Sequence, residues 1–212
     1  MNGIWIWAGA LLVYGIFWLW YVGLRGPLTA AEVERQLASL EAPALGATPA
    51  QLATFRAFLE ADDGREFFML NLIRLHPGEV PDPVSGAPRP ARSVLEGYTG
   101  KFMPALFRRA GHPALFGRAA GGYVEHWGVE PDPGWSFAGV IRYRSRRDVV
   151  ELVTDPRFAE FHRYKLAAIA QTLAFPLAPG FVVVGPRVTV ALAFALLAAL
   201  AQLGLRVGGA GR

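Results

Sequence analysis

Two long uncharged stretches determine where the polar part of this 212-residue chain can fold. Ile4–Leu24 has no charged side chain and carries tryptophans near both of its ends, while Val188–Leu205 is rich in alanine and leucine and is bracketed by arginines. A helix of about 20 apolar residues crosses a hydrocarbon core of about 30 Å, and aromatic and basic residues favour its interfaces. All 17 acidic residues lie between Glu32 and Glu160. We therefore expect one polar domain between two transmembrane helices.

These stretches divide the chain into five expected parts. They are an anchor over 1–25, a helical connector over 26–64, the polar domain over 65–185, a second transmembrane helix over 186–206 and a tail over 207–212. A cleaved signal peptide is the alternative for the first stretch, but neither a basic amino end nor a small-residue cleavage site is evident. A helix packed on the domain or lying in the membrane interface is the alternative for the second, although only Thr189 and Gln202 interrupt its apolar surface.

We expect an integral protein of a bacterial inner membrane, and the charges beside the apolar stretches bear on its orientation. Arg25 and Arg35 follow the first apolar stretch, which favours a cytoplasmic domain, whereas Arg206 and Arg212 favour the opposite orientation. Because arginines beside these stretches supply part of the net charge of +4, the charge indicates contact with a lipid bilayer and not with nucleic acid. The chain has no cysteine, which excludes disulfides, thiolate nucleophiles and cysteine-based metal sites.

The stretch Trp135–Lys165 has the clearest local pattern in the polar domain. Trp135–Tyr143 is rich in aromatic and β-branched residues, which is typical of a strand. Ser145 can then cap a first helix, and Asp155 can cap a second helix whose first position is a proline. Upstream, Thr29 and Thr48 begin two connector helices through capping boxes.

The remaining elements give the order strand, helix, strand, strand, helix, strand. The other expected strands are 66–74, 114–118 continued at 123–127, and 181–184, and the first helix runs from a Ser93–Glu96 capping box to about Ala110. This is the order of the ferredoxin-like βαββαβ fold, an α+β class in which both helices cover one face of the sheet. The proline- and glycine-rich segment 75–92 is expected to be a lid or a disordered insertion.

The strands are apolar on both sides, so the face without helices also needs a cover. A symmetric homodimer is the usual solution for such a face. The sequence therefore predicts two copies that pair through their sheets.

Several segments resemble an uncharacterised family of the dimeric α/β-barrel superfamily, over roughly Arg65 to Leu177. The matching segments are Met69–Leu72, Tyr98, Tyr143–Ser145, Asp155–Phe158 and Lys165–Ala168. The resemblance implies two sheets packed into a barrel, with a pocket between sheet and helices in each subunit.

Lys165 stands where arginine is common in the family, and Lys101 where a second tyrosine is common. The transmembrane helices and the segment 75–92 are additions. The superfamily includes cofactor-free monooxygenases, isomerases, haem enzymes and proteins without known activity, so no single chemistry follows.

Two side chains on the last helix are candidates for chemistry. His162 and Lys165 lie near one helix face, so both can point to the sheet. A histidine is suited to proton transfer, and a neighbouring cation lowers its pKa. His162 is therefore the candidate catalytic base and Lys165 a candidate ligand contact. The alternative places both at the helix flank, with Lys165 extending to water.

Four more residues are candidate ligand contacts. Asn71 is the one polar side chain inside the first strand, and Tyr98 belongs to an apolar helix stripe; each is either structural or a ligand contact. Arg142 either forms a cationic patch for a carboxylate or enolate or marks an exposed strand end. His126 can line a pocket beside Trp127.

The four histidines have no metal-ligand spacing, and no nucleotide-binding, hydrolase or zinc-protease motif is present. No cofactor is predicted, although haem stays possible because one axial histidine suffices. Three functions remain: an accessory domain that binds a small lipophilic or aromatic molecule, a cofactor-independent monooxygenase or isomerase with His162 as base, and a structural dimerisation module of a membrane assembly.

Overall fold

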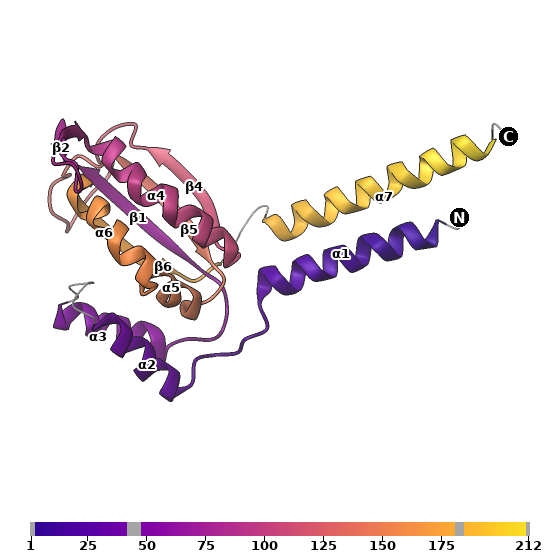
Figure 1. Cartoon of the computed structure of the whole chain (residues 1–212), viewed down its shortest axis with the longest axis horizontal. Coiled ribbons are helices and arrows are strands. Elements are labelled where there is room, and N and C mark those ends of the chain that lie inside the picture. Colours follow the sequence, from indigo (N-terminus) through magenta and orange to yellow (C-terminus); the bar gives the residue numbers. More distant parts are fainter. Residues whose placement is uncertain (1–2, 42–47, 181–184, 211–212) are drawn as a thin grey trace. The chain divides into compact units, whose positions relative to one another are not determined.

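The computed structural model describes residues 3–41, 48–180 and 185–210, and the chain forms two compact units. One unit is Arg25–Ala178, and the other combines Met1–Leu24 with Pro179–Arg212. The elements of both units are labelled in Figure 1.

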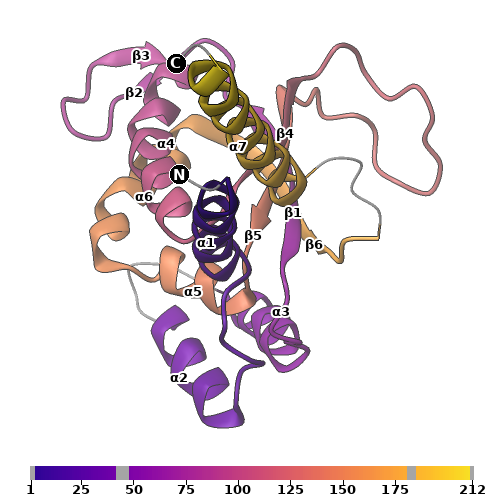
Figure 2. The ribbon, with the colours of Figure 1, turned by 90° about the vertical axis from the view of Figure 1, so that its right-hand side faces the viewer.

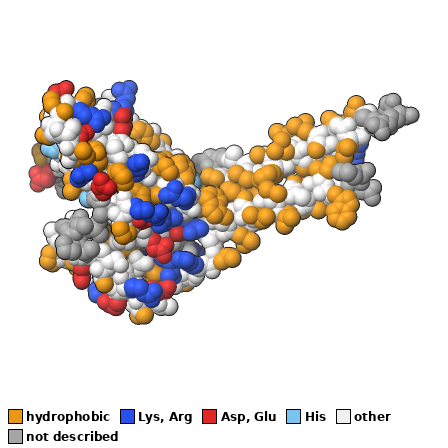
Figure 3. Space-filling model, in the orientation of Figure 1, with side chains coloured by type: hydrophobic (Ala, Val, Ile, Leu, Met, Phe, Trp, Pro, Cys, Tyr) orange, Lys and Arg blue, Asp and Glu red, His pale blue; other side chains and the backbone are white. Residues whose placement is uncertain are grey.

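The smaller unit is an antiparallel pair of helices, α1 (Ile4–Val22) and α7 (Pro186–Ala210). Trp7 Nε1 donates to Gln202 Oε1 at 2.7 Å, so one polar group of each helix is satisfied within the pair. Hydrophobic side chains cover most of the surface of these helices that is visible in Figure 3. Both helices are long and apolar enough to cross a membrane, judged by length and composition. Two long apolar helices are thus confirmed, while their insertion in a membrane stays a prediction.

A four-stranded antiparallel sheet with the strand order β4-β5-β1-β6 is the centre of the larger unit. Its strands are β1 (Phe67–Leu75), β4 (His112–Arg118), β5 (Phe137–Tyr143) and β6 (Ile169–Leu177). Helices α4 (Ala91–Arg108) and α6 (Pro156–Ala168) lie on one side of this sheet, as Figure 2 shows. The succession β1, α4, β4, β5, α6, β6 and the central place of β1 confirm the expected α+β architecture.

Residue alternation separates a covered face of the sheet from an open one. Met69 pairs with Ile141, and both pack against the core that the helices cover. The neighbouring pair, Leu70 and Val140, therefore points to the other side. Phe175 lies beside Leu70 in the register and is 41% exposed. We call this side, with Leu70, Val140 and Phe175 at its centre, the open face.

The last strand of the sheet, β6, lies earlier in the chain than the segment 181–184 expected for it. The strand expected at 181–184 lies outside the described residues. Helix α6 ends at Ala168, and residues 169–177 pair with β1. Pairing with a strongly apolar central strand outweighs the helix propensity of this alanine-containing segment. Pro176 is tolerated because β6 is an edge strand.

Two more local expectations are wrong. Residues 123–127 are not a strand but part of the loop 119–136 that joins β4 to β5, where glycines and prolines prevent regular pairing. Helix α4 begins directly after Pro90, and no side chain caps it. The Ser93–Glu96 capping box therefore does not form, because the fixed backbone of Pro90 starts the helix earlier.

The segment 75–92 contains an ordered hairpin of β2 (Glu79–Pro81) and β3 (Pro88–Pro90). Asp82 closes the turn: its carboxylate accepts from the backbone N–H groups of Val84 and Ser85 and pairs with Arg89 at 2.7 Å. These hydrogen bonds hold the pKa of Asp82 well below its usual range. The segment is thus an ordered hairpin and not a disordered insertion, while a role as a lid stays a prediction.

Three further helices complete the larger unit, and their expected starts are confirmed. They are α2 (Ala30–Leu40), α3 (Pro49–Glu60) and α5 (Arg146–Val153). Thr29 and Thr48 form capping boxes with Glu32 and Gln51, and Ser145 caps α5. Apolar side chains of all three helices join the core on the covered side of the sheet.

Helix α4 ends in a turn with one strained residue. The backbone N–H of Gly111 donates to the Leu106 carbonyl at 3.0 Å, and Ala110 has a φ of +56°. A Cβ atom in this left-handed region crowds the following carbonyl and costs about 1–2 kcal/mol. Gly111 thus lies one position beyond Ala110, the residue whose backbone conformation favours glycine. Gly111 is also needed, because a Cβ there would lie 2.3 Å from Leu106 Cδ1.

We expect Ala110→Gly to raise the free energy of unfolding by about 1 kcal/mol, because it removes the crowded Cβ atom. Denaturant unfolding of the full-length protein in detergent, followed by circular dichroism, measures the change. Ala53→Gly, in the exposed interior of α3, is the matched control and should lower stability by about 1 kcal/mol. A loss of stability in both variants would contradict the assignment of strain to Ala110.

Candidate functional site

Four titratable side chains meet between the helices and the sheet. They are Tyr98 on α4, Tyr143 on β5, and His162 and Lys165 on α6. The rings of Tyr98 and His162 are in edge contact with centroids 6.4 Å apart, and Lys165 Nζ lies 5.8 Å from the Tyr98 ring centroid. Tyr98 is close enough to Tyr143 to affect the pKa of that hydroxyl. We call these four residues the helix–sheet cluster.

The chain brings the cluster together through simple periodicities. His162 and Lys165 lie one turn apart on α6, so they share a helix face as the sequence predicts. Tyr98 stacks on Phe102, one turn further along α4, with centroids 5.3 Å apart. Tyr143 alternates with Arg142 along β5 and therefore faces the helices. Tyr143 was not among the predicted site residues, although it shares the strand parity of the apolar side chains of β5.

Burial sets the protonation behaviour of the cluster. It raises the pKa of the Tyr98 and Tyr143 hydroxyls, which stay protonated and can donate hydrogen bonds. It also lowers the pKa of Lys165. The pKa of His162 is lowered first by burial and then by the charge of Lys165, which favours a neutral imidazole.

The ammonium group of Lys165 is partly buried and forms no hydrogen bond or ion pair with any other residue in the described ranges. The hydroxyls of Tyr98 and Tyr143 likewise have no partner there. In the same ranges, Asp62 Oδ1 is the one fully buried side-chain nitrogen or oxygen atom without a hydrogen bond. The unpartnered polar tips of the cluster are therefore not completely enclosed by protein.

Asn71 lies on the covered face, on the same side of β1 as Met69. Its amide nitrogen donates to the carbonyl of Met69 at 2.9 Å and to that of Gly139 at 3.4 Å. Backbone carbonyls thus occupy its donors, and Asn71 acts here as a link between β1 and β5.

Arg142 forms neither the expected cationic patch nor an exposed strand end, because its side chain is buried and paired within the protein. Its side chain is 1% exposed, and its guanidinium binds Glu66 Oε2 at 2.7 Å and the Ala110 carbonyl at 2.6 Å. Arg142 lies on the face opposite the cluster, so it cannot assist His162. Glu66 directly precedes β1, and only the antiparallel register of β1 and β5 brings the two charges together.

His126 lies apart from the cluster, in the loop 119–136. This loop borders a cavity of about 620 Å³ whose other wall includes Leu72 and Leu173. Both leucines have the strand parity of the open face, so the cavity and the cluster lie on opposite sides of the sheet. The loop projects on the side away from α4 and α6 in Figure 2. The predicted site residues are thus divided between two places.

A second hollow, of about 520 Å³, lies near the start of α2 and is lined by charged side chains. Arg25 pairs with Glu151 at 3.2 Å, and Arg147 pairs with Glu32. The hydrogen bond from Arg147 is the main cause that lowers the pKa of Glu32 to about 2. Most of this charge is therefore neutralised within the hollow.

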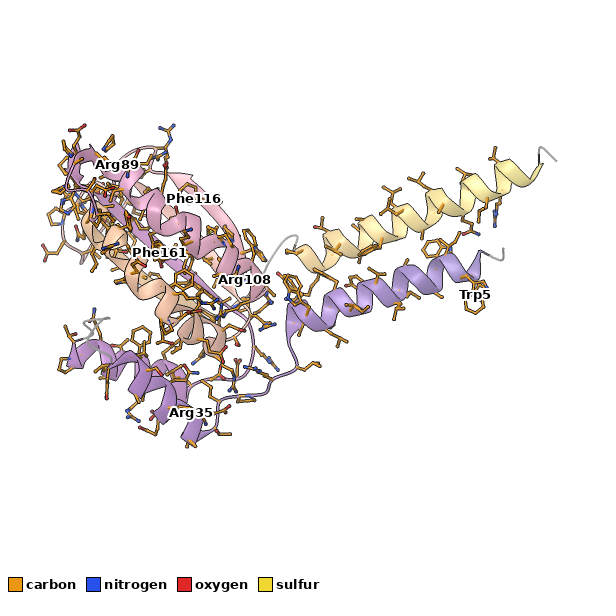
Figure 4. All side chains as sticks on the ribbon, viewed as in Figure 1. Trp5, Arg35, Arg89, Arg108, Phe116 and Phe161 are labelled. Carbon is orange, nitrogen blue, oxygen red and sulfur yellow. The ribbon has the colours of Figure 1, made fainter. Side chains whose placement is uncertain are left out.

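No group of three or more histidine or acidic side chains suited to a metal ion occurs in the described part of the chain. The aromatic wall of the cluster continues along α4 and α6, where Phe102 meets Phe158 with centroids 6.3 Å apart. Lys101, the other lysine of the chain, lies outside the cluster, 5.5 Å from the ring centroid of Phe161, which Figure 4 labels.

The larger unit is similar to solved structures, among them that of a protein of unknown function. RPA0582 from Rhodopseudomonas palustris, a protein of unknown function, is 24% identical with a TM-score of 0.51, over 64% of this chain and 96% of that chain. Its methylated form gives 26% identity and a TM-score of 0.52, over 64% and 93%. At3g17210 from Arabidopsis thaliana gives 16% and 0.36, over 56% and 99%. The chain matches no protein-family model and no curated protein sequence. The likeness to RPA0582 supports a shared fold of the domain and carries no activity.

The burial of Lys165 leads to a direct prediction. Reductive methylation with carbon-13 formaldehyde labels Lys101 and Lys165, the two lysines of the chain, and NMR then follows their titration. We expect the midpoint of Lys165 to be lower in the folded protein than in the denatured chain, because burial disfavours its cation. The signal is assigned with Lys101→Arg.

The same shift predicts a pH dependence of stability. Between the two midpoints of Lys165 the denatured chain binds more protons than the folded one, so the free energy of unfolding rises with pH. Lys165→Met should remove this rise, while Lys101→Met should keep it. Equal midpoints in the folded and denatured states would show that Lys165 is not desolvated.

Proposed function

We propose that the domain binds a small aromatic or lipophilic molecule with an acidic group at the helix–sheet cluster. The observation that carries this proposal is the partly buried ammonium group of Lys165, which has an aromatic neighbour but no acidic partner in the described chain. A cation withdrawn from water without a partner is costly, and a carboxylate or enolate on a ligand would offset that cost. The aromatic rings of α4 and α6 would contact the rest of the ligand.

The polar groups of the cluster suit an anionic acceptor. The hydroxyls of Tyr98 and Tyr143 are held protonated by burial, so each has one O–H to donate. Together with Lys165 they would present three donors to a carboxylate, and charge-assisted hydrogen bonds are the stronger kind. Asn71 and Arg142 are not included, because their donors are used within the protein.

A cofactor-independent isomerase or oxygenase is the second candidate function, and the state of His162 favours it. The lowered pKa keeps the imidazole neutral near neutral pH, so it can accept a proton from a bound substrate. Lys165 would then stabilise the developing negative charge. Deuterium exchange into an acidic C–H bond of a bound aryl ketone would separate the two functions. Catalysis requires exchange that His162→Gln abolishes, whereas binding alone gives none.

We further propose that α1 and α7 anchor the domain in a bacterial inner membrane, with the domain on the cytoplasmic side. Their length, their apolar composition and the arginines beside them support this placement. We also propose a homodimer that pairs through the open face, because side chains such as Phe175 leave an exposed apolar surface on an otherwise packed sheet. If the domain served only as a structural dimerisation module, the open face would be sufficient for that role and no ligand site would be required.

The anchored dimer leads to a prediction. The full-length protein should stay in membranes washed with alkaline carbonate and should sediment as a dimer after extraction in detergent. Phe175→Asp places a charge on the open face at an exposed position and should yield a folded monomer. Phe107→Asp, at a 50% exposed position of α4, is the control and should stay dimeric. Release by carbonate would refute the anchor, and a monomeric wild type would refute the pairing.

Ligand binding is tested with benzoate on the full-length protein in detergent. The methyl-lysine signal of Lys165 should shift saturably with benzoate, and benzyl alcohol should bind more weakly because it lacks the charge. Lys165→Gln, followed by fluorine NMR of fluorobenzoate, should weaken binding about tenfold. Lys101→Gln should leave it unchanged. Unchanged affinity in Lys165→Gln would refute the assigned site, and a dimer that binds no aromatic acid would favour the structural role.

A further inference from the structure

The loop 119–136 has a defined shape although it contains no helix or strand. Asp132 joins its two limbs: one carboxylate oxygen accepts from the backbone N–H of Tyr123 at 3.1 Å and the other from that of Gly134 at 2.8 Å. Trp135 Nε1 donates to the Tyr123 hydroxyl at 3.0 Å, which fixes two aromatic side chains relative to each other. These hydrogen bonds thus fix Tyr123 and Trp135 within the loop.

Aromatic side chains of this loop border the cavity of about 620 Å³ described above. Tyr123, Trp127 and Trp135 contribute to its walls, together with the open-face leucines. This volume is in the range of small-molecule sites. Trp127 is 76% exposed, so most of its indole is available to a ligand. The cavity can therefore accept an apolar body against several ring faces.

The charge of the loop is entirely negative. Residues 119–136 include Glu125, Glu130 and Asp132 but no lysine or arginine, in a chain whose net charge is +4. Asp132 is engaged by the backbone, whereas Glu125 and Glu130 line the cavity and form no ion pair with any residue in the described ranges. The cavity thus combines ring faces with two carboxylates that lack a counter-charge.

We propose that this loop cavity binds an organic cation, a quaternary or protonated ammonium group with an apolar body. The negative face of an aromatic ring attracts a cation, and the attraction is larger where several rings surround it. The two carboxylates add a long-range attraction that an uncharged ligand does not feel. Neither an anion nor a neutral ligand would use both features. The site is separate from the helix–sheet cluster, since it lies on the other side of the sheet.

The test uses fluorotryptophan-labelled full-length protein in detergent, with choline as the probe. Of the six tryptophans, four lie in α1 and two, Trp127 and Trp135, border the cavity. We expect choline to shift the fluorine signals of Trp127 and Trp135 saturably and to leave the other four unchanged. The signals are assigned with Trp127→Phe and Trp135→Phe. The uncharged isostere 3,3-dimethyl-1-butanol should need about tenfold higher concentration for the same shift.

The double variant Glu125→Gln/Glu130→Gln keeps the shape of both side chains and should weaken choline binding about tenfold while leaving the isostere unchanged. Glu79→Gln/Glu96→Gln, at exposed positions outside the cavity, is the matched control and should bind choline as the wild type does. Equal binding of choline and its isostere, or no saturable shift at the two loop tryptophans, would overturn the proposal. Lys165→Gln should leave choline binding unchanged, so failure of the benzoate site and failure of this site are separate results.

Discussion

The pairing of β1 with two antiparallel neighbours is the constraint on which the rest of the domain depends. Because β5 and β6 both bond to it, β1 has ladder partners on each side, and its apolar side chains must alternate between two faces. One face is covered by helices and holds the core. The other carries equally apolar residues, and the described helices of the unit pack on the opposite side. The open face, the covered core and the two candidate sites all follow from this one strand.

The same register explains why Arg142 is paired within the protein whereas the ammonium group of Lys165 is not. Arg142 lies beside Phe68 in the register, and its guanidinium reaches Glu66, which precedes β1. A buried guanidinium with a carboxylate and a carbonyl is satisfied and serves structure. Lys165 is placed by α6 above the opposite face, where its neighbours are aromatic rings and an imidazole. An ammonium group in such surroundings is left to attract an external anion.

The two candidate sites therefore have opposite preferences. The helix–sheet cluster offers a cation and protonated hydroxyls, whereas the loop cavity offers ring faces and the carboxylates of Glu125 and Glu130. They lie on opposite sides of one sheet, so a ligand at one does not occlude the other. If the domain is anchored and paired as proposed, the loop cavity lies on the side of the sheet that faces the second copy, and the cluster lies away from it.

Local chemistry alone was sufficient to predict the helix starts at Thr29, Thr48, Ser145 and Asp155, the strand β5, which begins two residues later than expected, and the two apolar helices. It was also sufficient to place His162 and Lys165 on one face, because the spacing along a helix is a property of the sequence. The edge strand β6, the bond between Arg142 and Glu66, and the place of Tyr143 beside Tyr98 were decided only by tertiary structure. Each depends on strand pairing between residues far apart in the chain, and no local pattern encodes which partner or register is chosen.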